Sequence, residues 1–350
     1  MDQTDSSSST DVRPNLIRRL WNNVSIVFDS KTATIGLFIV LFWIFVAVFA
    51  PILTPYTPTE QDWKYNNRSP SFTPYAIKDH RLLEKELKSG EEIDFALEDR
   101  IRRAYANTDY EYYDSVHPLG TDELGRDLWA RLIYGARIVL VILPVSENAW
   151  IPGGTAIWGV FFSLLFGTIL GLTSGYSGGW VDEVIMRVLD AMISIPLILL
   201  YLIIVAAIGA SAVNVVVAIA IVGTPGIARL VRSLTLDVKT REFVSAAETR
   251  GERPLYIMAV EILPNARGPI IIDAMLRVGY AIFAMGTLGF LGLGMPPPSP
   301  DWGSMVAKGR EFILTGSPWQ ALWPALAIAT VVIGLNLLAD GLREESLKYQ

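Results

Sequence analysis

Six long apolar stretches constrain this chain more than any other feature of its sequence. Each is long enough to cross the hydrocarbon core of a bilayer, about 30 Å thick, as a helix. They lie near Ala33–Leu53, Thr155–Gly175, Val184–Ile208, Val213–Val231, Ile270–Leu293 and Trp319–Leu338. Because backbone polar groups in lipid must be satisfied internally, such spans fold as helices. The sequence therefore predicts an all-α membrane protein with six transmembrane helices.

Composition agrees with this class and excludes several others. Of the 350 residues, 51% are hydrophobic and 18% are charged, which is too apolar for a soluble domain of this length. The net charge of -6 argues against a nucleic-acid partner. There is no cysteine, and the two histidines, His80 and His117, form no HExxH pattern. We therefore expect no metal site, no cofactor and no cysteine chemistry.

Lysine and arginine residues near the ends of the spans predict the orientation. They cluster before span one, between spans four and five, and after span six, at Arg13, Arg18, Arg19, Lys31, Arg229, Arg232, Lys239, Arg241, Arg250, Arg253, Arg343 and Lys348. Basic loops stay in the cytoplasm, so both termini are expected there. We expect a cytoplasmic tail (1–32), a first transmembrane helix (33–53), an extracytoplasmic insertion with an interfacial helix (54–134), and a core transmembrane domain (135–350).

Span two carries a stripe of small residues at every fourth position. Its members are Thr155, Gly159, Ser163, Gly167, Gly171, Gly175 and Gly179. Four-residue spacing places them on one helix face, where a second helix backbone can approach closely. The sequence predicts a helix-packing face whose partner lies either in this chain or in a second subunit.

A polar segment, Glu242–Pro264, lies between spans four and five. Small side chains at Ser245–Ala247 would give a flat helix surface suited to lie against another protein. Gly251 and Pro264 are expected to break the helix twice and to form a helix–turn–helix entry into span five.

The same segment resembles the EAA loop of ABC-importer membrane subunits, which reads E-A-A, three residues, G, nine residues, then I-x-L-P. The matching residues are Ala246, Ala247, Gly251, Leu263 and Pro264. Ser245 and Glu261 stand where that pattern has Glu and Ile. Further stretches resemble the dipeptide/oligopeptide permease family in its own order: His117–Arg137, Ser174–Pro196, Leu263–Ile272, Phe290–Arg310 and Asn336–Glu344.

The resemblance is to the C-type permease subunit and implies a type I ABC importer permease fold. It implies partners as well: a homologous B-type permease, two cytoplasmic ATPase subunits and an extracytoplasmic solute-binding protein, in a cell membrane. The coupling residues that it implies are Glu242, Ser245, Ala246, Ala247, Gly251, Leu263 and Pro264. Because no G-x-x-x-x-G-K-[ST] motif occurs in the chain, we expect ATP to be hydrolysed by the partners.

Several alternatives stay open at this point. The solute could be a peptide, an oligosaccharide or nickel, since members of this family import each of them. A protein of another class, a membrane-anchored enzyme or receptor acting through 54–134, is the rival. The segments 54–116 and 144–154 match no pattern. The loop at 296–310 could re-enter the membrane or form a plain turn, with Trp302 suited to a membrane interface.

Charges inside or beside the spans are few. Arg187 and Asp190 in span three, and Asp273 and Arg277 in span five, are expected near the inner ends, leaving the middle of the pore without fixed charge. Outside the membrane, Thr121 or Asp122 could cap a helix, and the spacing of Asp127 and Arg131 favours an i,i+4 pair.

Overall fold

The computed structural model describes residues 28, 30–61, 66–72, 116–141 and 153–348. Throughout these residues the secondary structure is helical, apart from one isolated bridge between Thr121 and Asp127. Most of the unmatched segments 54–116 and 144–154 lies outside the described residues.

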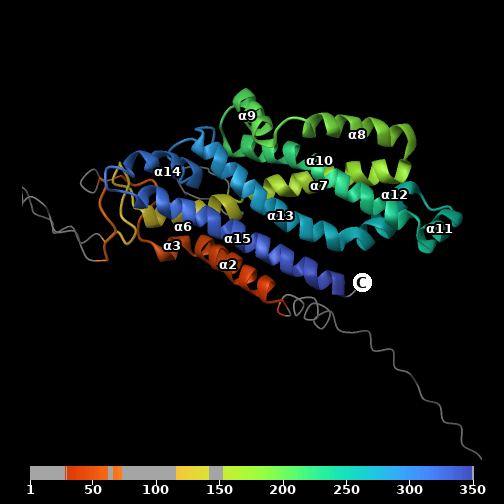
Figure 1. The fold of residues 1–350 in the computed structure, drawn as a ribbon, viewed down its shortest axis with the longest axis horizontal. Coiled ribbons are helices and arrows are strands. Elements are labelled where there is room, and N and C mark those ends of the chain that lie inside the picture. The colour runs from red at the N-terminus through yellow and green to blue at the C-terminus, as the bar shows by residue number, and fades with distance from the viewer. Residues whose placement is uncertain (1–27, 29, 62–65, 73–115, 142–152, 349–350) are drawn as a thin grey trace, which may run out of the picture.

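The helices form an elongated bundle (Figure 1). In chain order they are α2 (Lys31–Val48), α3 (Ala50–Leu53), α6 (Leu128–Leu140), α7 (Thr155–Ser177), α8 (Gly179–Ile193), α9 (Leu197–Ile208), α10 (Ala212–Lys239), α11 (Glu242–Thr249), α12 (Pro254–Tyr256), η2 (Ile257–Ile262), α13 (Leu263–Phe290), α14 (Trp302–Gly309), η3 (Arg310–Phe312) and α15 (Trp319–Lys348). Within the described residues, five helical segments are long and apolar enough to cross a membrane, with α12, η2 and α13 counted as one.

The third predicted span is not one continuous helix, and this corrects the expectation for Val184–Ile208. It consists of α8 and α9, which meet at an angle of 89°. Pro196 lacks an amide hydrogen and disfavours helical geometry in the residue before it, so α8 ends at Ile193. Six spans result only if this bent pair counts as one.

The small-residue face of α7 packs against α10 of the same chain. A Cβ atom added to any of four of its glycines would lie 2.6 to 2.7 Å from an α10 atom. The contacts pair Gly159 with Ile219, Gly167 with Ile227, Gly171 with Val231, and Gly175 with Thr235. The two backbones therefore approach more closely than side chains would permit.

Two other members of the stripe, Ser163 and Gly179, differ from each other. Ser163 lies inside it and donates hydrogen bonds from its hydroxyl to the carbonyls of Ile219 (2.9 Å) and Ala220 (3.2 Å). Gly179, which the spacing also assigned to the stripe, lies beyond the end of α7 at Ser177 and has open space around it. That assignment is wrong because α7 ends at Ser177, and the four-residue period does not continue past the end of the helix.

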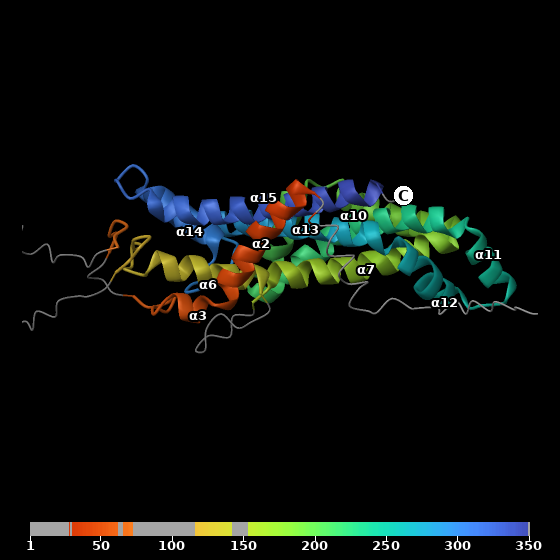
Figure 2. The same ribbon diagram turned by 90° about the horizontal axis from the view of Figure 1, so that it is seen from below.

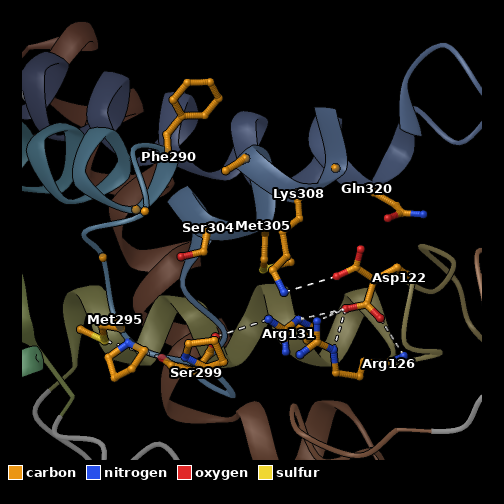
Figure 3. A pocket seen from close by; sticks show the side chains of 18 of the residues that line it. Asp122, Arg126, Arg131, Phe290, Met295, Ser299, Ser304, Met305, Lys308 and Gln320 are labelled. Carbon is orange, nitrogen blue, oxygen red and sulfur yellow. Dashed lines mark hydrogen bonds and ion pairs between the residues drawn. The ribbon is translucent and has the colours of Figure 1, made fainter. Parts of the chain in front are cut away.

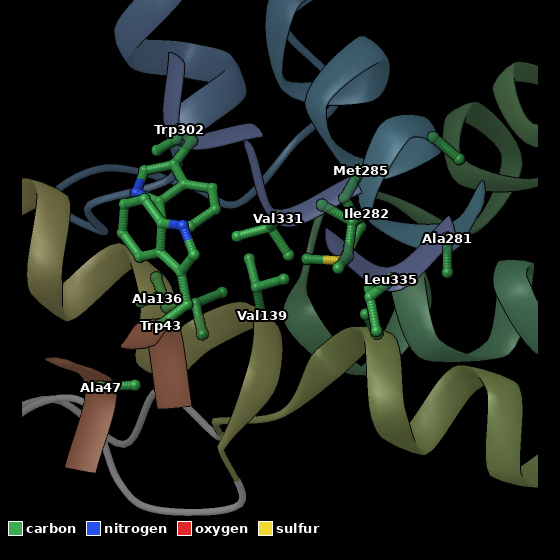
Figure 4. Close-up of a cluster of buried hydrophobic side chains, with 14 of the residues drawn as sticks. Trp43, Ala47, Ala136, Val139, Ala281, Ile282, Met285, Trp302, Val331 and Leu335 are labelled. Atoms are coloured by element: carbon green, nitrogen blue, oxygen red, sulfur yellow. The ribbon is translucent and has the colours of Figure 1, made fainter. Parts of the chain in front are cut away.

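The main hydrophobic core joins α2, α6, α13, α14 and α15 (Figure 4), together with parts of α7, α9 and α10. Trp302, only 2% exposed, packs edge-to-face on Trp43 with ring centroids 5.2 Å apart. Its indole donates a hydrogen bond to the Leu132 carbonyl (2.9 Å). Trp302 is therefore a core residue and not the interface aromatic that the sequence indicated. The loop after α13 is more than a plain turn, since its helix α14 packs on α13 and α15.

Pro264 does not break the helix that enters span five, contrary to expectation. Residues Pro254 to Phe290 run as one helical segment, with the π-helical turn η2 just before Leu263. The Leu263 amide bonds to the Met258 carbonyl, five residues back, so the turn is wider than in an α-helix. Such a turn lets the chain accommodate a proline within a continuous helix.

The two ends of the bundle are formed by different helices. In Figures 1 and 2, α11 and α12 extend from one end, while α3, α6 and α14 gather at the other. The start of α2 lies beside the last turns of α15, since a Cβ on Gly341 would touch Ala33. The start of the first span, the end of the last span and the α10–α13 loop therefore lie toward the same end.

Candidate functional site: the loop between α10 and α13

Helix α11 fixes the position of the predicted coupling segment. Val244 and Ala247 are completely buried in a second core with residues of α7, α10 and η2. Ser245, Ala246 and Glu242 are exposed on the other side of the helix. Ser245 and Ala246 therefore lie on an exposed helix face, whereas Ala247 does not belong to that face and packs α11 against its own subunit.

The end of α11 is defined by backbone geometry at Gly251. Its φ angle is +78°, in the left-handed region that favours glycine. The Gly251 amide donates to the Glu248 carbonyl (2.9 Å) and the Glu252 amide donates to the Ala247 carbonyl (3.2 Å). These two bonds form a Schellman motif, which satisfies the last carbonyls of the helix. The predicted helix end at Gly251 is confirmed.

Four apolar side chains, which the sequence reasoning missed, are exposed around α11. They are Phe243, Leu255, Tyr256 and Val260, with Leu255 the most open at 76%. Clustered exposed apolar residues mark sites of contact with protein or membrane. No sequence signal distinguished them, because apolar residues that are buried, such as Val244 and Ile257, occur in the same segment.

Polar contacts tie this loop to α7, join α10 to α7, and link two parts of the loop to each other. The Tyr176 hydroxyl donates to Glu248 (3.2 Å), and Lys239 donates to the Tyr176 carbonyl (2.6 Å). Arg250 pairs with Glu261 at 3.5 Å. Glu261, which stands where the EAA-loop pattern has Ile, therefore has a partner within the loop. Leu263 is half-buried and Pro264 is exposed at the start of α13.

Helix α8 is held to its neighbours mainly by ion pairs. Asp182 accepts two hydrogen bonds from Arg232 of α10, at 2.6 and 2.5 Å, and a further one from Ser174 of α7. Asp190 pairs with Arg229 at 2.5 Å. Leu189 is the one buried residue of α8, so apolar packing contributes little to its position. Arg187 pairs with Glu183 on the same helix instead.

The Asp273–Arg277 pair forms as the spacing predicts, but not where it was expected. Arg277 lies against Gly223 and Gly226, near the middle of α10, and it donates to the Gly223 carbonyl (3.4 Å). The pair therefore lies beside the middle of α10 and not beside its end, where the sequence placed it. Because Gly226 has no side chain, the guanidinium can lie directly against the α10 backbone.

The opposite end of the bundle holds buried charges and a cavity of 390 Å³ (Figure 3). Asp127 caps α6 by accepting from the Ala130 amide (2.6 Å) and also contacts His117 at 2.7 Å. The cap is therefore Asp127, whereas Thr121 or Asp122 was expected. Arg131 lies 3.7 Å from Asp122 and does not pair with Asp127, because Asp127 is already engaged.

The described residues contain no group of three or more side chains suited to hold a metal ion. The residues predicted to form the coupling loop thus lie at one end and the buried charge cluster at the other. Nothing in the described arrangement brings them together into one reactive centre.

Comparison with known proteins identifies the family. Residues 167–344 match the family described as "Binding-protein-dependent transport system inner membrane component". Residues 24–70 match the "N-terminal TM domain of oligopeptide transport permease C".

Curated relatives match over most of the chain. The dipeptide transport system permease protein DppC of Alkalihalophilus pseudofirmus is 36% identical over 90% of this chain and 85% of its own length. The di/tripeptide transport system permease protein DppC of Pseudomonas aeruginosa is 34% identical over 98% of this chain and 96% of its own. The glutathione transport system permease protein GsiD of Pectobacterium atrosepticum is 39% identical over 66% of this chain and 72% of its own length. This chain is therefore a multi-pass membrane protein that belongs to the family of binding-protein-dependent transport system inner membrane components.

Proposed function

We propose that this chain is the C-type permease subunit of an ATP-driven importer of peptides. The observation that carries the proposal is α11, a short helix at one end of the bundle, closed by Gly251 and surrounded by exposed apolar side chains. A surface of this kind fits docking to another protein. The names of the relatives, which include dipeptide and di/tripeptide permeases, support peptides as the solute.

The proposed assembly has this chain beside a homologous B-type permease, with two cytoplasmic ATPase subunits and an extracytoplasmic solute-binding protein. It lies in the cytoplasmic membrane with both termini inside and the 54–134 insertion outside. ATP binding closes the ATPase pair and moves the 242–264 loop. Because α11 is packed on α7, α10 and η2, the motion reaches the spans and opens the path alternately to each side.

Residues of the loop have distinct proposed roles. Glu242, Ser245 and Ala246 are exposed and face the ATPase subunit. Ala247 and Leu263 hold α11 and the start of α13 in place from inside the subunit, while Gly251 and Pro264 set the backbone path between them.

Reconstitution tests the function directly. The chain is purified with its partner subunits, placed in proteoliposomes with its binding protein, and supplied with ATP on the ATPase side. We expect uptake of a labelled dipeptide that requires ATP and is lost when the ATPase subunits are omitted. Nickel and an oligosaccharide serve as competing solutes. Uptake of either of these without uptake of peptide would change the solute class, and uptake without the ATPase subunits would refute the mechanism.

A further inference from the structure

Tyr176 lies in the last turn of α7, at a point where three helices meet. Its partly buried ring packs against the second core, which contains Val244 and Ala247 of α11. Its hydroxyl donates a hydrogen bond to Glu248 of α11 (3.2 Å). Its backbone carbonyl accepts a hydrogen bond from Lys239, the last residue of α10 (2.6 Å). Tyr176 therefore contacts α11 through its side chain and α10 through its backbone.

Lys239 holds the ends of α7 and α10 together. The two helices run in the same direction, since Gly159 packs against Ile219 and Gly175, further along, packs against Thr235. The Lys239 ammonium lies 5.0 Å from the centroid of the Tyr176 ring, which is a cation–π contact. It also places a positive charge at the C-terminal end of α7, where the helix dipole favours one. The close backbone packing of these helices thus continues up to Tyr176, so they form one unit at this end.

Helix α11 is joined to the α7–α10 pair at two points. The two-residue linker 240–241 connects the end of α10 to the first residue of α11. Glu248, which binds Tyr176, lies six residues after that first residue, about 9 Å along the helix at 1.5 Å per residue. Val244 and Ala247 are buried between the two points. With the linker alone the helix could pivot about its first turn, whereas a second attachment in the last turn fixes its direction.

We propose that Tyr176 is a positioning residue for coupling, which fixes the direction of α11 against the α7–α10 pair. When the ATPase subunits displace α11, the Tyr176–Glu248 bond makes the pair follow. Without this bond, a fraction of ATPase cycles would pivot α11 and leave the spans in place. This inference rests on the proposed coupling of the loop to ATPase subunits, and it names the residue that carries the displacement into the spans.

The experiment uses the assembled importer in proteoliposomes with its binding protein. Tyr176→Phe removes the hydroxyl and keeps both the ring and the carbonyl that Lys239 contacts. We expect ATP hydrolysis and co-purification of the ATPase subunits to stay as in the wild type. The number of ATP molecules hydrolysed per imported dipeptide should rise about two- to fivefold, as expected for the loss of one partly exposed hydrogen bond. Tyr280→Phe makes the same chemical change at an exposed residue of α13 outside the second core, and it should leave this ratio unchanged.

Variants of Glu248 test whether the hydroxyl acts through this partner. Glu248→Gln keeps an oxygen that can accept the hydrogen bond, so it should retain a ratio close to that of the wild type. Glu248→Ala removes the acceptor and should behave like Tyr176→Phe. The double variant of Tyr176→Phe and Glu248→Ala should be no worse than either single variant, because both remove the same bond. Fully additive effects would show that the two residues act through different contacts and would overturn the proposal.

Hydrogen exchange measures the position of α11 independently of transport. In the assembled importer without ATP, the backbone amides of α11 should exchange about two- to fivefold faster in Tyr176→Phe than in the wild type, because the helix has lost one attachment. The amides of α13 should exchange at the wild-type rate, since the bond joins α11 to α7.

The outcomes separate this role from the function. Unchanged exchange in α11 means that the contact does not position the helix. Faster exchange with a wild-type ratio of ATP to peptide means that it has no role in coupling. If Tyr176→Phe loses the ATPase subunits, the residue acts in docking. Each of these results overturns the proposal while leaving peptide import by the wild type intact. If the wild type imports no peptide, the proposed function fails and the coupling role fails with it.

Discussion

Gly251 shows how a single backbone angle defines one end of the coupling segment. A Cβ atom added there would meet nothing within 4 Å, so space alone would permit a side chain. The φ angle of +78° would not, because left-handed geometry is unfavourable for residues with a Cβ and worst for β-branched ones. The two hydrogen bonds of the helix end depend on this geometry.

We therefore expect Gly251→Val to strain the loop by roughly 1–2 kcal/mol. Part of that strain would be relieved by moving α11, which lowers association of the ATPase subunit and solute uptake while the protein still reaches the membrane. Co-purification of the ATPase subunit and uptake in proteoliposomes measure the two effects. Gly251→Asn is the matched control, since asparagine tolerates the left-handed region. This variant should keep most of the association with the ATPase subunit and most of the solute uptake. Normal coupling in the valine variant would show that the contact lies elsewhere.

Elements of this chain are held together in two different ways. Helices α7 and α10 meet through glycines, with backbones in close contact along several turns. Helix α8, by contrast, is connected to the bundle chiefly by the Asp182–Arg232 and Asp190–Arg229 pairs. Close backbone packing resists separation, whereas ion pairs at partly exposed positions contribute less.

Gly167→Val should destabilise the α7–α10 contact. Its new Cβ would lie 2.6 Å from Ile227, in a helix face that cannot shift without moving α10. We expect a loss of about 1–3 kcal/mol, as for other overpacked sites, and a lower Tm of the purified protein in detergent. Gly268→Val is the matched control, because Gly268 is also helical but has open space around it. Equal Tm values for the two variants would contradict the close packing.

Asp182→Ala should loosen α8 without unfolding the bundle. The pair with Arg232 is partly exposed, so we expect a loss of about 1 kcal/mol, or roughly fivefold faster hydrogen exchange in α8. Glu183→Ala removes the adjacent carboxylate, which pairs only within α8, and should leave exchange unchanged. Identical exchange in both variants would mean that the ion pair does not position α8.

At the scale of the whole molecule, the bundle has two distinct ends. The coupling segment, the start of α2 and the last turns of α15 lie toward one end, and the cavity with its buried charges lies at the other. From the distribution of basic residues we predict that the first end faces the cytoplasm.

The native chain has no cysteine, so single probes can test this orientation cleanly. Leu314, 97% exposed in the loop between α14 and α15, is suited to report on the outer side. Leu314→Cys should react with an impermeant maleimide in intact cells, and Ser245→Cys should react only after the cells are opened. The reverse pattern would invert the topology.

The sequence by itself determined the helical membrane class, the position of the segment between α10 and α13, the helix end at Gly251 and the small-residue face of α7. These follow from local rules: apolar length, four-residue spacing and the backbone freedom of glycine. Only the tertiary structure decided that α10 is the partner of that face, that Ala247 points inward, and that span three bends at Pro196. It also decided that Trp302 and Arg131 are buried and that Arg277 lies against α10. These outcomes depend on which elements meet in space. The spacing of residues along one helix does not specify which other helix packs against it.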